Sequence, residues 1–179
     1  MAQVSKLDAA ERLIVSGINM VGRGDDPIAI HVVAASALNM LRELIQEKGD
    51  DYTAWVLREG LHLLATARLK GMPINLPTTP EIDALIDDVA RGIENGAIKE
   101  PTDLKVTLDT EERRRLVAYI IRPFNFLKHA QRDPLATLDE DDVDQEGAII
   151  HALTAYSVLR PGQALPEQVA SFLAKHDLL

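Results

Sequence analysis

The chain contains no cysteine in its 179 residues. Disulfide bonds, thiolate metal sites and a cysteine nucleophile are therefore excluded, and any chemistry must come from histidine, hydroxyl, lysine, arginine or carboxylate side chains. The N-terminus lacks a charged region followed by a long apolar stretch, so no secretory signal is expected. The most apolar stretch, 28–41, is interrupted by polar residues and is too short to span a bilayer. These absences predict a cytoplasmic protein that has no membrane as a partner.

Charge of one sign predominates, with 28 acidic against 19 basic residues and a formal net charge of −9. Such a surface repels phosphate backbones, which argues against broad DNA binding, although a local basic patch can still contact RNA or a nucleotide. The composition is otherwise that of a folded protein, 46% hydrophobic and 26% charged. Because neither an internal repeat nor a composition shift interrupts the chain, residues 1–179 are expected to form a single domain.

Apolar residues recur at three- and four-residue steps along most of the chain, which predicts an all-α bundle of about six or seven helices. The stretch 27–48 is apolar nearly all round and is expected to be the buried central helix. Ser5 and Asp26 suit N-caps, Pro27 suits a first helical position, and Gly49 suits a helix end. The expected helices are 8–21, 27–48, 52–70, 80–94, 110–131, one that follows the acidic run 139–146 and reaches 159, and a short one after 166.

The segment 122–134 carries the most promising group of polar side chains. If it is helical, one face carries residues at steps of three and four, namely Arg122, Asn125, Lys128, His129 and Arg132. That face is positive in a negative protein. Guanidinium groups hold phosphate oxygens in bidentate contacts, and an imidazole exchanges protons near neutrality. The pattern therefore suits phosphate chemistry.

Two interpretations of this face stay open. Arg122 and His129 are seven residues apart, about 10 Å along a helix. They reach one substrate only through the long arginine side chain, a kink at Pro123 or a second subunit. The alternative is the solvated face of an amphipathic helix, with Arg132 and Asp133 in a purely structural contact.

Two runs of the sequence carry a family resemblance. The run 29–35 reads AIHVVAA and the run 125–134 reads NFLKHAQRDP. Together they resemble an uncharacterised family of all-helical bacterial proteins with an AIHxxAA…NFxKHAxRDP pattern. The resemblance spans most of the chain and implies the helical fold, whereas the family has no established activity to carry over.

The segment 122–134 is also similar to the signature of HEPN ribonucleases and toxins. In that superfamily an arginine and a histidine lie four to six residues apart on a helix of a small bundle, and here six residues separate Arg122 from His129. The resemblance implies metal-independent RNA cleavage by this pair, commonly at a homodimer interface. A polar residue often follows the arginine there, and Pro123 departs from that pattern.

His31 lies on the apolar helix expected at 27–48. It is either a satisfied core residue or, with Asn39, lines the same cavity as His129, where it would orient a ligand. No metal site is predicted, because the chain has no His-x-x-x-His pair and no metalloprotease motif. The acidic run 139–146 lacks the glycine of a calcium loop and is expected to be the solvated start of a helix. No cofactor is expected.

Two functional hypotheses result. In the first, a HEPN-like protein performs metal-independent RNA or nucleotide phosphodiester chemistry. There Arg122 and Lys128 hold a phosphate and His129 acts as acid or base. Asn125, Arg132 and His31 would make further ligand contacts. In the second, the chain is a non-catalytic module that binds an anion or a partner. A homodimer is expected in either case, because several apolar helical faces must be covered.

Overall fold

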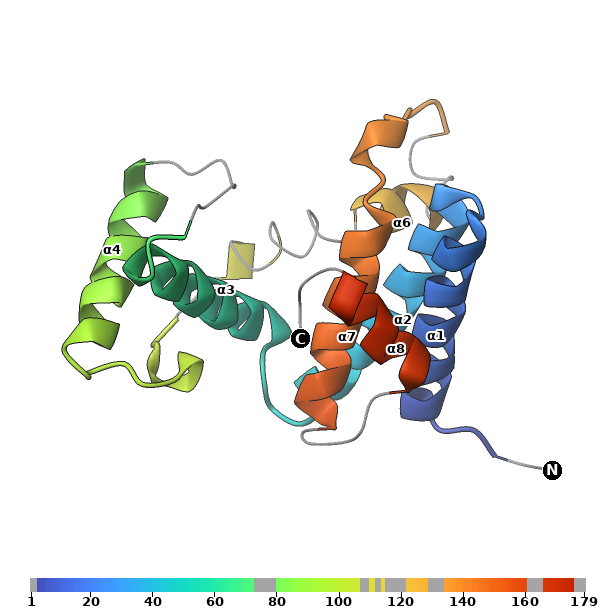
Figure 1. Cartoon of the computed structure of the whole chain (residues 1–179). Helices are drawn as coiled ribbons and strands as arrows, with labels where there is room; N and C mark the ends of the chain where they lie inside the picture. The colour runs from blue at the N-terminus through green and yellow to red at the C-terminus, as the bar shows by residue number, and fades with distance from the viewer. Residues whose placement is uncertain are drawn as a thin grey trace. The chain divides into compact units, whose positions relative to one another are not determined.

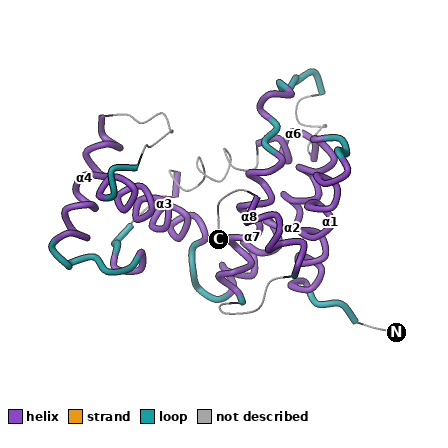
Figure 2. The backbone as a smooth tube through the Cα atoms, in the orientation of Figure 1, coloured by secondary structure: helices purple, strands orange, loops and turns teal. Residues whose placement is uncertain are grey.

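The computed structural model describes residues 3–72, 80–106, 110, 111, 114, 122–128, 134–160 and 166–175. Within these ranges the chain has seven α-helices and two 3₁₀ turns and no strand, which confirms the all-α class and the number of helices expected (Figure 1, Figure 2). Close contacts divide the chain, expected to be one domain, into two compact units: unit 1, residues 1–51 and 116–179, and unit 2, residues 52–115. Each unit is described by itself.

Unit 1 is built around α2 (Pro27–Glu47), which packs against α1 (Lys6–Arg23), α6 (Arg122–Lys128) and α7 (Gln145–Leu159). The short α8 (Glu167–Lys175) covers α1. The prediction of a buried central helix is therefore confirmed. Burying these side chains stabilises the unit, since each fully buried aliphatic side chain contributes about 1.5–3 kcal/mol. The largest completely buried side chains of unit 1 include Ile14, Leu38, Leu41, Ile45 and Ile149.

Local cap chemistry sets the helix boundaries of unit 1 as the sequence predicts. The Ser5 hydroxyl accepts a hydrogen bond from the Asp8 amide at 3.1 Å, and the Asp26 carboxylate accepts from the amides of Ile28 and Ala29. Each of these side chains satisfies amides that have no partner within the helix. The buried Tyr156 of α7 donates its hydroxyl hydrogen to the Glu11 carboxylate of α1, which ties these two helices together.

The sequence prediction treated the apolar stretch within α2 as too short for a membrane span. The helix that contains it runs for 21 residues and, by length and composition alone, is long and apolar enough to cross a membrane. The central helix of a water-soluble bundle meets the same criteria. Eight residues of α2 are buried and the helix packs against three others, so the protein interior accounts for its apolar surface.

Unit 2 pairs α3 (Tyr52–Leu69) with α4 (Pro80–Glu94). Its core combines Ala65 of α3, Ile86 and Val89 of α4, and Leu104. Arg68 joins the two helices through ion pairs with Asp83 at 2.7 Å and Asp87 at 2.6 Å.

Two features of unit 2 are not evident from helical periodicity. Leu69 lies at the apolar spacing of α3 and is nevertheless 44% exposed, and Ile82 and Leu85 of α4 are also exposed. Between the helices predicted at 80–94 and 110–131, Pro101–Asp103 forms a 3₁₀ turn, η1, in which the Asp103 carboxylate accepts from the amides of Lys99 and Glu100. Helical periodicity does not register such a three-residue turn.

Candidate functional site

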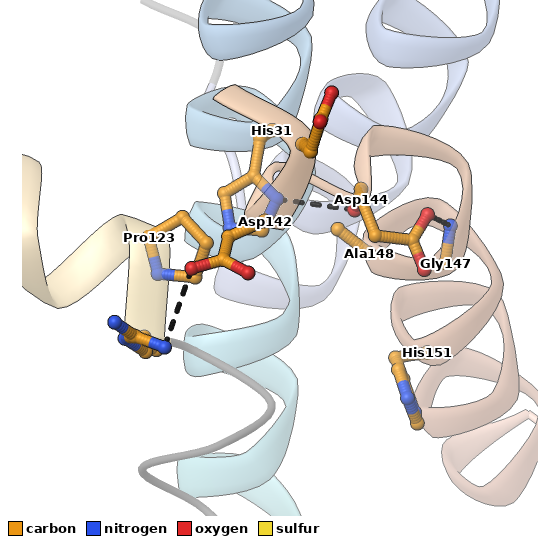
Figure 3. Close-up of a pocket in the computed structure, with 9 residues that line it drawn as sticks. His31, Pro123, Asp142, Asp144, Gly147, Ala148 and His151 are labelled. Carbon is orange, nitrogen blue, oxygen red and sulfur yellow. Dashed lines mark hydrogen bonds and ion pairs between the residues drawn. The ribbon is translucent and has the colours of Figure 1, made fainter. Parts of the chain in front are cut away.

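A cavity of about 260 Å³ opens in unit 1 where α2, α6 and the start of α7 meet. Its volume lies just below the range of about 300–1,000 Å³ typical of drug-sized ligand sites, so it suits a small molecule. Figure 3 shows the lining side chains in close-up. They come from all three helices and from the turn η2 (Glu140–Asp142), namely His31, Arg122, Pro123, Asp141, Asp142, Asp144, Gly147, Ala148 and His151.

His31 is the most deeply placed polar group of this pocket. Its side chain is 2% exposed, and its Nδ1 lies 3.1 Å from the backbone oxygen of Asp144, as the dashed line in Figure 3 marks. A carbonyl oxygen only accepts hydrogen bonds, so Nδ1 must carry the hydrogen. Burial lowers the pKa of His31 below its usual 6.5, which keeps the ring neutral near pH 7. The Nε2 atom is then an unprotonated acceptor.

This Nε2 acceptor is buried and has no hydrogen-bond partner among the described residues. A buried polar atom without a partner costs about 1–3 kcal/mol, so such atoms are rare in folded proteins. The interpretation of His31 as a satisfied core histidine is therefore correct for Nδ1 only. Its second nitrogen is available to a ligand that donates a hydrogen bond.

The start of α7 positions the other side of the pocket. The Asp144 carboxylate accepts a hydrogen bond from the Gly147 amide at 2.7 Å and so caps the helix. A Cβ at position 147 would collide with the Asp144 carboxylate, so a larger residue there would displace the cap. One residue thus caps α7 with its side chain and holds His31 with its backbone oxygen.

Arg122 brings a cation to the rim. Its Nη1 lies 3.3 Å from the Asp142 carboxylate, and both side chains are largely exposed, at 64% and 46%. An exposed ion pair of this kind contributes little to stability. The buried Pro123 beside it packs into the pocket wall.

His151 lies farther along α7 than Gly147 and Ala148 (Figure 3). Burial lowers its pKa, while the charge of Asp144 opposes that shift. With both imidazoles neutral, the described lining residues comprise three aspartates and one arginine, and their net charge is negative.

The positive face expected over 122–132 is only partly represented in this pocket. Among its described members, Arg122 lines the cavity, whereas Asn125 does not and Lys128 places its ammonium 5.6 Å above the Phe124 ring. His129 and Arg132 lie outside the described residues. Asn39, which one of the two interpretations of His31 places in the same cavity, is not among the described lining residues and donates toward Glu43 on its own helix.

Sequence reasoning missed the acidic contribution to this site. The run 139–146 is predicted to be a solvated helix start, but three of its aspartates line the cavity: Asp141 and Asp142 of the turn η2, and Asp144 directly before α7. A clue was present, because an aspartate-rich turn directly before a helix places carboxylates beside whatever packs on that helix end.

Comparison of the chain with protein-family models, with curated proteins and with solved structures finds no match in any of the three.

Proposed function

We propose that unit 1 is a helical module that binds a small polar molecule in the pocket between α2, α6 and α7. The observation that carries this proposal is the buried, unpartnered Nε2 of His31 in the lining of a cavity large enough for a ligand. A bound hydrogen-bond donor would satisfy this acceptor and remove the cost of leaving it unpaired. The arrangement favours binding over phosphodiester chemistry, because the lining is negative.

The test is nuclear magnetic resonance of the histidine side chains in the full chain. Three probes of equal chain length and different charge are added separately at pH 7.5: putrescine, 1,4-butanediol and succinate. At least one is expected to move the His31 imidazole signals in a saturable way while the His62 signals of unit 2 stay in place. If all three leave His31 unchanged up to high millimolar concentration, the pocket is not a small-molecule site.

RNA or nucleotide cleavage is a second candidate, favoured by one specific observation. Arg122 and two neutral imidazoles, His31 and His151, line the same cavity. A guanidinium can hold a phosphate, and two imidazoles can share the roles of acid and base. In the HEPN-like pair that the sequence resemblance implies, the imidazole of His129 acts together with the guanidinium of Arg122.

This candidate is tested by an RNA-cleavage assay in the presence of EDTA. Wild type is compared with Arg122→Ala and His129→Ala, and the fold of each variant is checked by circular dichroism. Cleavage that falls at least about 100-fold in both variants supports a nuclease, since acid–base groups contribute about 10²–10⁴-fold. Equal activity in all three proteins, or none, rules it out.

The homodimer and the cytoplasmic location remain predictions. Light scattering of the purified chain at micromolar concentration tests the first, with twice the chain mass of 19.7 kDa as the expected result.

A further inference from the structure

The charge of the pocket lining limits the kind of ligand it can accept. Among the described lining residues, three are aspartates from one short segment, Asp141, Asp142 and Asp144, and one, Arg122, carries a guanidinium. Partial enclosure between helices strengthens the effect of these charges relative to bulk water. An anionic ligand would meet net repulsion, whereas a cation would meet attraction.

The ion pair between Arg122 and Asp142 shows that the acidic segment can bind an organic cation. The guanidinium of Arg122 pairs with Asp142 at 3.3 Å, on a side chain that is mostly in solvent. Because an exposed pair of this kind is weak and is screened by salt, a ligand cation can take its place at the carboxylate without a large cost.

The Nε2 acceptor of His31 determines which kind of cation suits the pocket. Nδ1 donates to the backbone oxygen of Asp144, so Nε2 can only accept while the ring is neutral. Inorganic cations are less suited to the site, because within the described ranges no three His, Asp or Glu side chains are grouped to hold a metal ion. A primary ammonium group combines a positive charge with three donors, and so matches both the carboxylates and the imidazole nitrogen.

We propose that the pocket binds a small organic cation with a primary ammonium group, which donates to His31 Nε2 and replaces Arg122 as the partner of Asp142. This inference rests on the proposed binding function of unit 1 and specifies the class of its ligand. The cavity of about 260 Å³ limits that ligand to a compact molecule.

The experiment uses the full chain, the His31 signals and the same three probes at pH 7.5 and low salt. Putrescine is expected to bind at least about fivefold more tightly than 1,4-butanediol, and succinate is expected not to bind. Raising the salt should weaken putrescine binding, because charge carries part of the affinity.

Two variants with the same change of charge locate the interaction. Asp142→Asn removes the carboxylate that Arg122 contacts, whereas Glu140→Gln alters an exposed residue of the same turn outside the pocket lining. We expect Asp142→Asn to weaken putrescine binding at least about fivefold and Glu140→Gln to leave it within about twofold.

Three results would overturn the inference. One is equal binding of the diol and the diamine, another is preferred binding of succinate, and the third is an equal effect of the two variants. In the first two cases a ligand still reaches His31, so the proposed binding function stands while the cation is wrong. If none of the three probes shifts the His31 signals, both the proposed binding function and the proposed class of ligand are wrong.

Discussion

The Nδ1 atom of His31 lies 3.1 Å from the backbone oxygen of Asp144, a residue 113 positions away in sequence. This hydrogen bond joins the N-terminal part of the central helix α2 to Asp144, the residue that directly precedes α7. The Asp144 side chain meanwhile caps α7 through the Gly147 amide. His31 and Asp144 therefore connect the stability of unit 1 with the shape of its pocket.

Replacing His31 tests this connection. His31→Ala removes a buried ring and its hydrogen bond, which should lower the free energy of unfolding by about 2–4 kcal/mol. His31→Asn places an amide N–H where Nδ1 donates, so it should recover part of that loss. Urea unfolding followed by circular dichroism measures both variants. If the two are equally unstable, the bond to Asp144 contributes nothing and only ring packing matters.

The stability of unit 1 should depend on pH between 5.5 and 7.5. Burial lowers the pKa values of His31 and His151 below 6.5, so the unfolded chain binds protons that the folded one does not. The stabilising contribution is complete above pH 6.5 and is lost as the pH falls through the folded pKa values. Each group changes the free energy of unfolding by at most about 1.4 kcal/mol per pH unit.

Urea midpoints at the two ends of this range measure the effect. Hydrogen bonds lower the pKa values of Asp8 and Asp103 below 3.8. These two carboxyl groups therefore titrate below this pH range and do not contribute to the change in stability. The fall toward pH 5.5 should be smaller in His31→Asn than in wild type. The same fall in both proteins would show that His31 titrates normally.

Two substitutions of Asp144 separate the hydrogen bond that caps α7 from the negative charge of the carboxylate. Asp144→Ala leaves the Gly147 amide without its acceptor and should cost about 1 kcal/mol. Asp144→Asn keeps an acceptor in place and should cost less than half of that. Urea unfolding measures the two variants side by side, and an equal loss would mean that the cap bond does not stabilise the helix.

Two glycines of unit 2 offer a matched test of packing. An added Cβ meets nothing within 4 Å at Gly60 of α3, whereas at Gly92 of α4 it lies 2.4 Å from the Cδ1 of Ile98. Gly60→Ala should therefore stabilise unit 2 by about 0.5–1 kcal/mol. Gly92→Ala should not stabilise it, because the new methyl group has to displace the Ile98 side chain. Fluorescence of Trp55, the chain's single tryptophan, reports unit 2 during urea unfolding. A Gly92→Ala protein as stable as Gly60→Ala would contradict the packing at Ile98.

The helices were predictable because their signals are local. The apolar spacing of α1 and α2, and the caps at Ser5 and Asp26, all lie within a few residues of the boundaries they set. Periodicity alone places Leu69 on the apolar face of α3, yet its side chain is 44% exposed, because periodicity identifies a face of a helix but not where the neighbouring helix ends.

The candidate site was only half predictable. Arg122 and His31 were singled out by residue type, and the structure places both in one cavity. Asp142 and His151 come to them only through the packing of α7 against α2, which no local pattern encodes. The unsatisfied Nε2 of His31 likewise depends on a partner 113 residues distant at the other nitrogen.

The protonation state of His31 tests the central claim most directly. Nitrogen-15 spectra of the histidine rings at pH 7.5, in wild type and His31→Asn for assignment, report which ring nitrogen carries the hydrogen. The geometry predicts a neutral His31 ring with its hydrogen on Nδ1 and a bare Nε2. A ring protonated on Nε2, or on both nitrogens, at this pH would leave the pocket without its acceptor and contradict the account.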